Sequence, residues 1–105
     1  MGFRAHQRIV SKIKYDNADD FNCNFEKIRE IIEANSLITD EWTWEIDPED
    51  LKKCIEGIKE KYRLEDIAFE HYTYGDIVKV FERWLEKAEL HKDDLDNNSI
   101  YIDWF

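Results

Sequence analysis

Residues 3–15 alternate between apolar and polar side chains. A period of two that includes β-branched residues is typical of a half-buried strand, so this segment predicts a strand. Its inner face would carry Phe3, Ala5, Ile9, Ile13 and Tyr15, and its outer face Arg4, His6, Arg8, Lys12 and Lys14. A helix that pairs Ala5, Ile9 and Ile13 on one side also fits the spacing.

Three later segments repeat apolar residues every three or four positions, as amphipathic helices do. The expected helices cover residues 24–35, 48–62 and 74–91. Asn24 stands at the N-cap of the first, and Asp47 with Pro48 at the N-cap and N1 of the second. Thr73 and Asp76 match a capping box for the third. The buried stripes would consist of Phe25, Ile28, Ile31 and Ile32, then Leu51, Cys54, Ile55 and Ile58, then Ile77, Val80, Phe81, Trp84, Leu85 and Ala88.

Further strands are predicted over residues 41–46, 67–74 and 99–105, the second with imperfect alternation. Strands that are apolar on one side only are typical of antiparallel sheets with one covered face. The predicted fold class is therefore α+β, with three helices packed on one face of a three- to four-stranded, mainly antiparallel sheet. A chain of 105 residues is expected to form a single domain, residues 1–105.

The aromatic residues divide into expected core and expected surface. Trp84 and Phe81 belong to a helical stripe, while Trp42 and Trp44 share one face of a strand and should point inward. The remaining candidates lie off these stripes or at the chain's end, and exposure is expected for Tyr72, Tyr74, Tyr101 and Phe105.

The formal net charge of -10 disfavours direct binding to nucleic acid or to an anionic membrane, because both reward clusters of Lys and Arg. No apolar run approaches the roughly 18 residues that span a bilayer, and a cytoplasmic location is expected. The acids concentrate in loops and strand ends, whereas the first strand carries four basic side chains. If that strand lies beside the second or the last, its cations would pair with Glu41, Glu45 or Asp103.

Familiar catalytic and ligand-binding motifs are missing from the sequence. Three glycines, Gly2, Gly57 and Gly75, are too few for a P-loop or a dinucleotide fingerprint. The three histidines are far apart, and Asp94, Asp96 and Asn98 begin a calcium-loop pattern that fails at Ser99 and Phe105. Cys23 and Cys54 form no CxxC and are expected to be ordinary thiols. We therefore expect no cofactor, no metal ion and no enzymatic activity.

The opening Met-Gly-Phe-Arg-Ala resembles the start of small uncharacterised phage proteins, which begin Met-Gly-Tyr-Arg-Ser and then enter a strand. The resemblance covers five residues, departs at Phe3 and Ala5, and defines no site. It implies a phage or mobile-element setting, in which small acidic α+β proteins often inhibit host defence, some by imitating nucleic acid.

These features together predict a non-catalytic acidic inhibitor that occupies the basic, nucleic-acid-binding surface of a partner protein such as a nuclease. Carboxylates would stand in for phosphates, and tyrosines would supply anchoring area. The candidate partner-binding residues are Asp40, Glu41, Glu45, Asp47, Glu49, Asp50, Glu65, Asp66, Tyr72, Tyr74, Asp93, Asp94 and Asp96. The alternatives are an immunity protein or antitoxin against a nuclease toxin, a small assembly subunit, and an enzyme built on an unrecognised carboxylate pair.

Overall fold

The computed structural model describes residues 4–10, 14–15, 27–30, 42–94 and 99–105. In chain order its elements are β1 (Ala5–Val10), β2 (Lys14–Tyr15), β3 (Thr43–Ile46), α2 (Pro48–Lys61), β4 (Ile67–Phe69), β5 (Tyr72–Thr73), α3 (Tyr74–Leu90) and β6 (Ile100–Trp104). Residues 27–30 are also helical. No helix in these ranges is long and apolar enough to cross a membrane.

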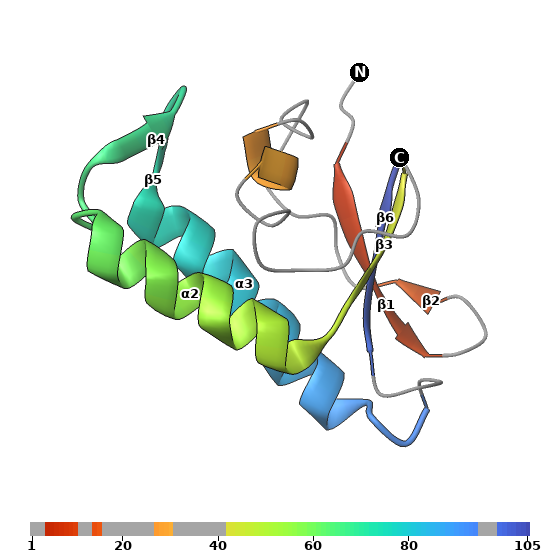
Figure 1. The fold of residues 1–105 in the computed structure, drawn as a ribbon. Coiled ribbons are helices and arrows are strands. Elements are labelled where there is room, and N and C mark those ends of the chain that lie inside the picture. Colours follow the sequence, from red (N-terminus) through yellow and green to blue (C-terminus); the bar gives the residue numbers. More distant parts are fainter. Residues whose placement is uncertain (1–3, 11–13, 16–26, 31–41, 95–98) are drawn as a thin grey trace.

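The main sheet has four strands in the order β2-β1-β6-β3, and every neighbouring pair is antiparallel. The C-terminal strand β6 lies in the middle, between β1 and β3 (Figure 1). This arrangement confirms the predicted α+β class and the antiparallel sheet. The single strand predicted over residues 3–15 is wrong, because β1 and β2 pair with each other as separate strands, with Arg8 opposite Tyr15.

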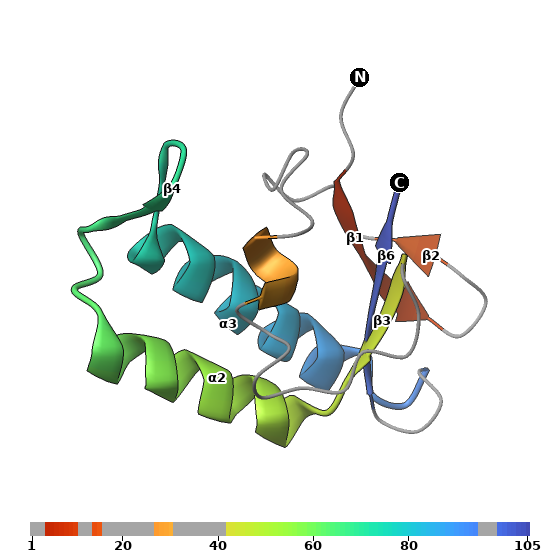
Figure 2. The same cartoon turned by 45° about the horizontal axis from the view of Figure 1, so that its top comes forward.

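Two of the three helix starts that the sequence signals are confirmed, and the third, at Asn24, lies outside the described residues. Asp47 is the N-cap of α2, with Pro48 in the first turn, and Thr73 caps α3 in a capping box with Asp76. The two helices lie side by side and run in opposite directions, so α3 ends near the start of α2 (Figures 1 and 2). The end of this helix pair that lies far from the sheet therefore carries the connection between the helices.

That connection contains a small hairpin instead of the strand predicted over residues 67–74. Strands β4 and β5 pair only with each other, as a separate two-stranded sheet. Glu70 adopts a positive φ of 51°, a conformation suited to tight turns. The chain reverses there, and a single strand through residues 67–74 cannot form.

The core lies between the helix pair and the sheet, where α3 contacts β1 and β6. It contains the expected Trp44, Phe81 and Trp84. Trp42, also expected to point inward, is 47% exposed, so this expectation is wrong; it lies just before β3 begins. Of the helix predicted over residues 24–35, only residues 27–30 are described. The packing of three helices on one face of the sheet therefore stays a prediction.

Candidate functional site

Two of the predicted acidic residues near the start of α2, Asp47 and Glu49, form local contacts within the fold. Asp47 Oδ1 accepts a hydrogen bond of 2.8 Å from the Glu49 backbone N–H, and Glu49 forms an ion pair with Lys52 at 3.2 Å. The Tyr101 hydroxyl donates a hydrogen bond to Glu45 at 3.4 Å. Asp40, Glu41 and Asp96 lie outside the described residues.

The remaining predicted acids lie at two opposite ends of the helix pair. Asp93 and Asp94 follow α3, close to the start of α2, whereas Glu65 and Asp66 follow α2 at the far end (Figures 1 and 2). Because α2 has 14 residues, its ends are about 21 Å apart. The acids that the sequence gathered into one set therefore belong to two separate surfaces.

Both ends of the helix pair combine acids with exposed apolar side chains, but the far end has more of them among the described residues. We call Leu64, Glu65, Asp66, Ile67 and Glu70 the hairpin surface. Ile67 is 58% exposed and Leu64 is 36% exposed, and the three carboxylates are exposed as well. Arg63, which precedes this surface in the chain, forms an ion pair with Glu65.

The backbone of the hairpin surface is fixed to the start of α3. The Gly75 N–H donates a hydrogen bond of 2.8 Å to the Leu64 carbonyl, and the Tyr74 N–H donates one of 3.0 Å to the Asp66 carbonyl. A Cβ at position 75 would lie 3.0 Å from the Leu64 carbonyl oxygen, which is closer than ordinary packing allows. Glycine at this position therefore lets the loop approach the helix.

The four aromatic residues expected at the surface differ in their exposure to solvent. Tyr72 is 7% exposed and belongs to the core, so its predicted exposure is wrong; it packs beside Phe69, with ring centroids 5.3 Å apart. Tyr74 and Tyr101 are half-buried. Phe105 is exposed and stacks on His6 with a centroid distance of 3.7 Å.

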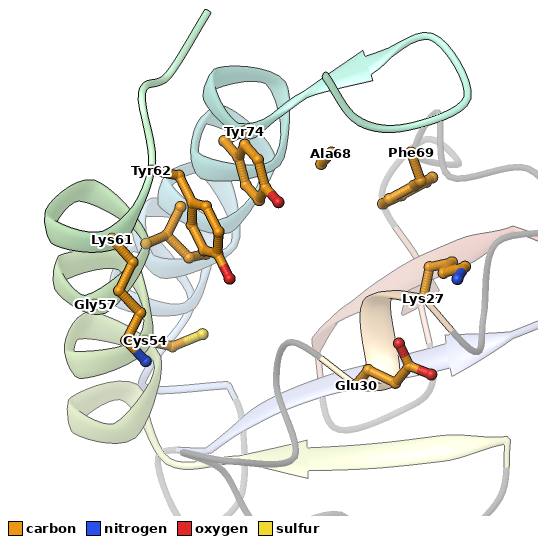
Figure 3. A pocket seen from close by; sticks show the side chains of 10 residues that line it. Lys27, Glu30, Cys54, Gly57, Lys61, Tyr62, Ala68, Phe69 and Tyr74 are labelled. Atoms are coloured by element: carbon orange, nitrogen blue, oxygen red, sulfur yellow. The ribbon is translucent and has the colours of Figure 1, made fainter. Parts of the chain in front are cut away.

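A pocket of about 430 Å³ opens beside the hairpin, between α2 and helical residues 27–30. Tyr62 and Tyr74 form one wall and stack with ring centroids 4.0 Å apart and planes inclined by 4°. Phe69 and Lys27 face them, with Glu30 below, and both tyrosine hydroxyls point into the space (Figure 3). Burial, followed by the neighbouring Tyr62 and the charge of Asp66, raises the pKa of Tyr74.

Part of the pocket floor is formed by α2 itself, at Cys54, Gly57 and Lys61. Cys54 is buried, as expected, and forms no disulfide within the described residues. Gly57 lies inside the helix, where glycine is less favourable than alanine by roughly 0.5–1 kcal/mol. No described atom lies within 4 Å of a Cβ built at this position. Sequence analysis missed the pocket, although a glycine inside an amphipathic helix is a signal that it could have used.

The expected pairing of the basic first strand with acids is confirmed at one position. Arg8 Nη2 lies 2.9 Å from Asp103 Oδ2 and 3.2 Å from Oδ1, across strands β1 and β6. Glu45, by contrast, meets the Tyr101 hydroxyl and faces no cation of β1 in the register of the sheet. The basic strand is thus neutralised in part from within the fold.

No cluster of three or more His, Cys, Asp or Glu side chains that could hold a metal ion occurs among the described residues. The pocket offers one carboxylate, Glu30, with two lysines, Lys27 and Lys61. Comparisons with protein-family models, curated proteins and solved structures give no match for this chain.

Proposed function

We propose that this chain is a non-catalytic acidic inhibitor that docks on the basic surface of a partner enzyme, through the hairpin surface. The target is the nucleic-acid-binding site of a nuclease or another defence enzyme, in the phage setting that the opening residues suggest. The observation that supports this best is the combination, on one surface, of exposed Leu64 and Ile67 with three exposed carboxylates.

Apolar side chains distinguish this surface from an ordinary solvated acidic one. The energy of protein interfaces is concentrated in a few desolvated anchors, while rim charges mainly govern association rate and partner choice. Leu64 and Ile67 supply such anchors. The acids at the other end of the helix pair, Asp93 and Asp94, follow one exposed apolar residue, Leu90 at the end of α3, but no comparable run of them among the described residues.

The negative charge of the hairpin surface favours a basic partner. Glu65, Asp66 and Glu70 are exposed and close in sequence to the two apolar side chains, and the whole chain carries a net charge of -10. Carboxylates spaced along a loop can contact Arg and Lys side chains that otherwise bind phosphates. The exposed Arg63–Glu65 pair opposes docking little, because exposed ion pairs contribute only about 0.2–1 kcal/mol.

The backbone at Glu70 adds an independent argument. A residue other than glycine at a φ of 51° costs about 1–2 kcal/mol. Asparagine or glycine would make the same turn with less strain. A glutamate at the exposed tip of the hairpin is therefore unfavourable for folding, which is consistent with a role of this side chain in binding.

The proposal is tested by removing equal charge at the two ends of the helix pair. One triple variant carries Glu65→Gln, Asp66→Asn and Glu70→Gln. Its matched control carries Glu49→Gln, Asp50→Asn and Asp93→Asn. Binding of each protein to a panel of purified nucleases, including nuclease toxins, is measured by biolayer interferometry at about 50 and 300 mM salt.

We expect wild-type protein to bind at least one nuclease with strong salt dependence. The hairpin triple variant should lose at least tenfold in affinity, and Ile67→Ser should also raise the dissociation rate. The control triple variant should change mainly the association rate, within about threefold. Absence of salt-sensitive binding across the panel, or equal losses in both triple variants, would refute docking through the hairpin surface. Binding confined to a nuclease toxin would favour an immunity protein.

A further inference from the structure

We propose that the pocket between α2, the β4–β5 hairpin and residues 27–30 binds a planar aromatic molecule that carries one anionic group. The site is separate from the hairpin surface and goes beyond the proposed function. Its volume of about 430 Å³ falls within the usual range for small-molecule sites, about 300–1,000 Å³.

Gly57 is the observation that points to a ligand. Alanine would favour α2 at this position, and no described atom would contact its methyl group. Packing among the described residues therefore gives no reason for a glycine here. A ligand that lies against the helix backbone does, because only glycine leaves that space open.

The shape of the pocket favours a flat ligand. Tyr62 and Tyr74 are stacked almost in parallel, with planes inclined by 4°, and Phe69 lies across the space from them (Figure 3). Because the two tyrosine rings stack on each other, they present their edges and hydroxyls to the pocket. Ring edges make favourable edge-to-face contacts with a planar aromatic ligand, which a saturated ligand of the same size cannot make.

Charge and hydrogen-bond donors favour an anion. Lys27 and Lys61 line the pocket against the single carboxylate of Glu30. The hydroxyls of Tyr62 and Tyr74, which are protonated at neutral pH, point into the same space (Figure 3). Two ammonium groups and a phenol that donates a hydrogen bond suit a carboxylate or phosphate, whereas a cationic ligand would meet two lysines.

The first experiment compares three probes that share one ring system: 2-naphthoate, its neutral amide 2-naphthamide, and the cation 2-naphthylmethylammonium. Each is titrated into the ¹⁵N-labelled full chain, and amide chemical shifts are followed by NMR. We expect 2-naphthoate to bind with shifts centred on Gly57 and Tyr62. The amide should bind roughly threefold to tenfold more weakly, and the ammonium compound more weakly still.

The second experiment uses Gly57→Ala with Glu56→Ala as its matched control, since Glu56 is exposed on the same helix and does not line the pocket. Gly57→Ala should raise Tm by about 3–6 °C and yet weaken 2-naphthoate at least tenfold. Glu56→Ala should leave its affinity unchanged. Tyr62→Leu, which keeps an apolar side chain but removes the flat face, should weaken all three probes.

The proposal is overturned if the three probes bind equally, or if shifts centre on Leu64 and Ile67 instead of Gly57. It is also overturned if Gly57→Ala lowers Tm, because the glycine would then have a packing role, or if this variant binds 2-naphthoate as wild type does. The hairpin triple variant retains every lining residue of the pocket and removes negative charge near it, so it should bind 2-naphthoate at least as tightly as wild type does. The two proposals can therefore fail independently.

Discussion

Arg8 and Asp103 join strands β1 and β6 through one guanidinium nitrogen, which lies within 3.2 Å of both carboxylate oxygens. The side chains are mostly buried, and the Arg8 guanidinium also lies over the Tyr101 ring, 5.0 Å from its centroid. The pair is therefore shielded from solvent more than the other ion pairs of the described chain, which involve exposed side chains. Shielded charges interact more strongly than exposed ones.

A double-mutant cycle should show this difference. Arg8→Met and Asp103→Asn should each destabilise the protein by about 1–3 kcal/mol, since each leaves a shielded charged partner without its hydrogen bonds. The coupling energy from urea unfolding should be about 1–2 kcal/mol. The exposed pair Glu49–Lys52 is the control and should couple by less than about 0.5 kcal/mol. Equal coupling in the two cycles would contradict a shielded pair.

Tyr15 should make stability fall at alkaline pH. Burial, followed by the hydrogen bond and charge of Asp103, raises the pKa of Tyr15 above its ordinary 10.0. The folded state thus retains a proton that the unfolded state loses, so this contribution is complete below pH 10 and is lost as pH rises through the folded pKa.

Tyr15→Phe keeps the ring near Phe105 but cannot ionise. The difference in unfolding free energy between wild type and this variant should therefore be constant from pH 7 to 9 and should decrease above pH 10. Urea unfolding at each pH measures this difference, and absorbance at 295 nm follows tyrosinate. A difference that does not change up to pH 11 would show that Tyr15 is not perturbed in the fold.

Local signals were enough to predict the helices but not the arrangement of the strands. The starts of α2 and α3 are set within four residues, by Asp47 with Pro48 and by Thr73 with Asp76. The two hairpins were missed because an alternating pattern looks the same whether the strand continues or turns back. The turn at Glu70 is especially hidden, since glutamate is not a residue that usually marks a positive φ.

The candidate site was predictable only in part, for a similar reason. Exposed acids are visible in the sequence, but their division into two surfaces depends on the antiparallel arrangement of α2 and α3. The pocket requires Lys27, Gly57 and Phe69 to meet from three segments. The burial of Tyr72 likewise depends on the β4–β5 hairpin, in which it packs beside Phe69, and periodicity does not encode that contact.

Substitutions at Asp47 can distinguish a structural role of this side chain from a role in partner binding. Its carboxylate caps α2, so Asp47→Ala should cost about 1 kcal/mol in chemical denaturation. Asparagine caps helices about as well, and Asp47→Asn should stay within about 0.5 kcal/mol of wild type although it removes the charge. If the asparagine variant were as unstable as the alanine variant, the charge near the helix dipole would be the main contribution instead of the cap. Partner binding should be unaffected by Asp47→Asn, because Asp47 lies at the end of the helix pair opposite the hairpin surface.

Substitutions at Gln7 test how tightly β1 packs against α3. Its Nε2 donates a hydrogen bond of 2.7 Å to the Trp84 carbonyl in the core, and its Oε1 has no hydrogen-bond partner among the described residues. Gln7→Glu would place an ionised acceptor against another acceptor and should cost about 3–5 kcal/mol at pH 7. Burial should raise the pKa of the new carboxyl above its usual 4.3 or so.

The penalty of Gln7→Glu should therefore shrink as pH falls from 7 to 5, because the protonated acid regains a donor for the Trp84 carbonyl. Gln7→Met is the control: it loses the hydrogen bond, at about 1 kcal/mol, but has no group that titrates, so its penalty should be the same at both pH values. Urea unfolding of the three proteins measures these differences. A Gln7→Glu penalty that is small and independent of pH would mean that water reaches this position, and that β1 and α3 are packed less tightly than the burial of Gln7 indicates.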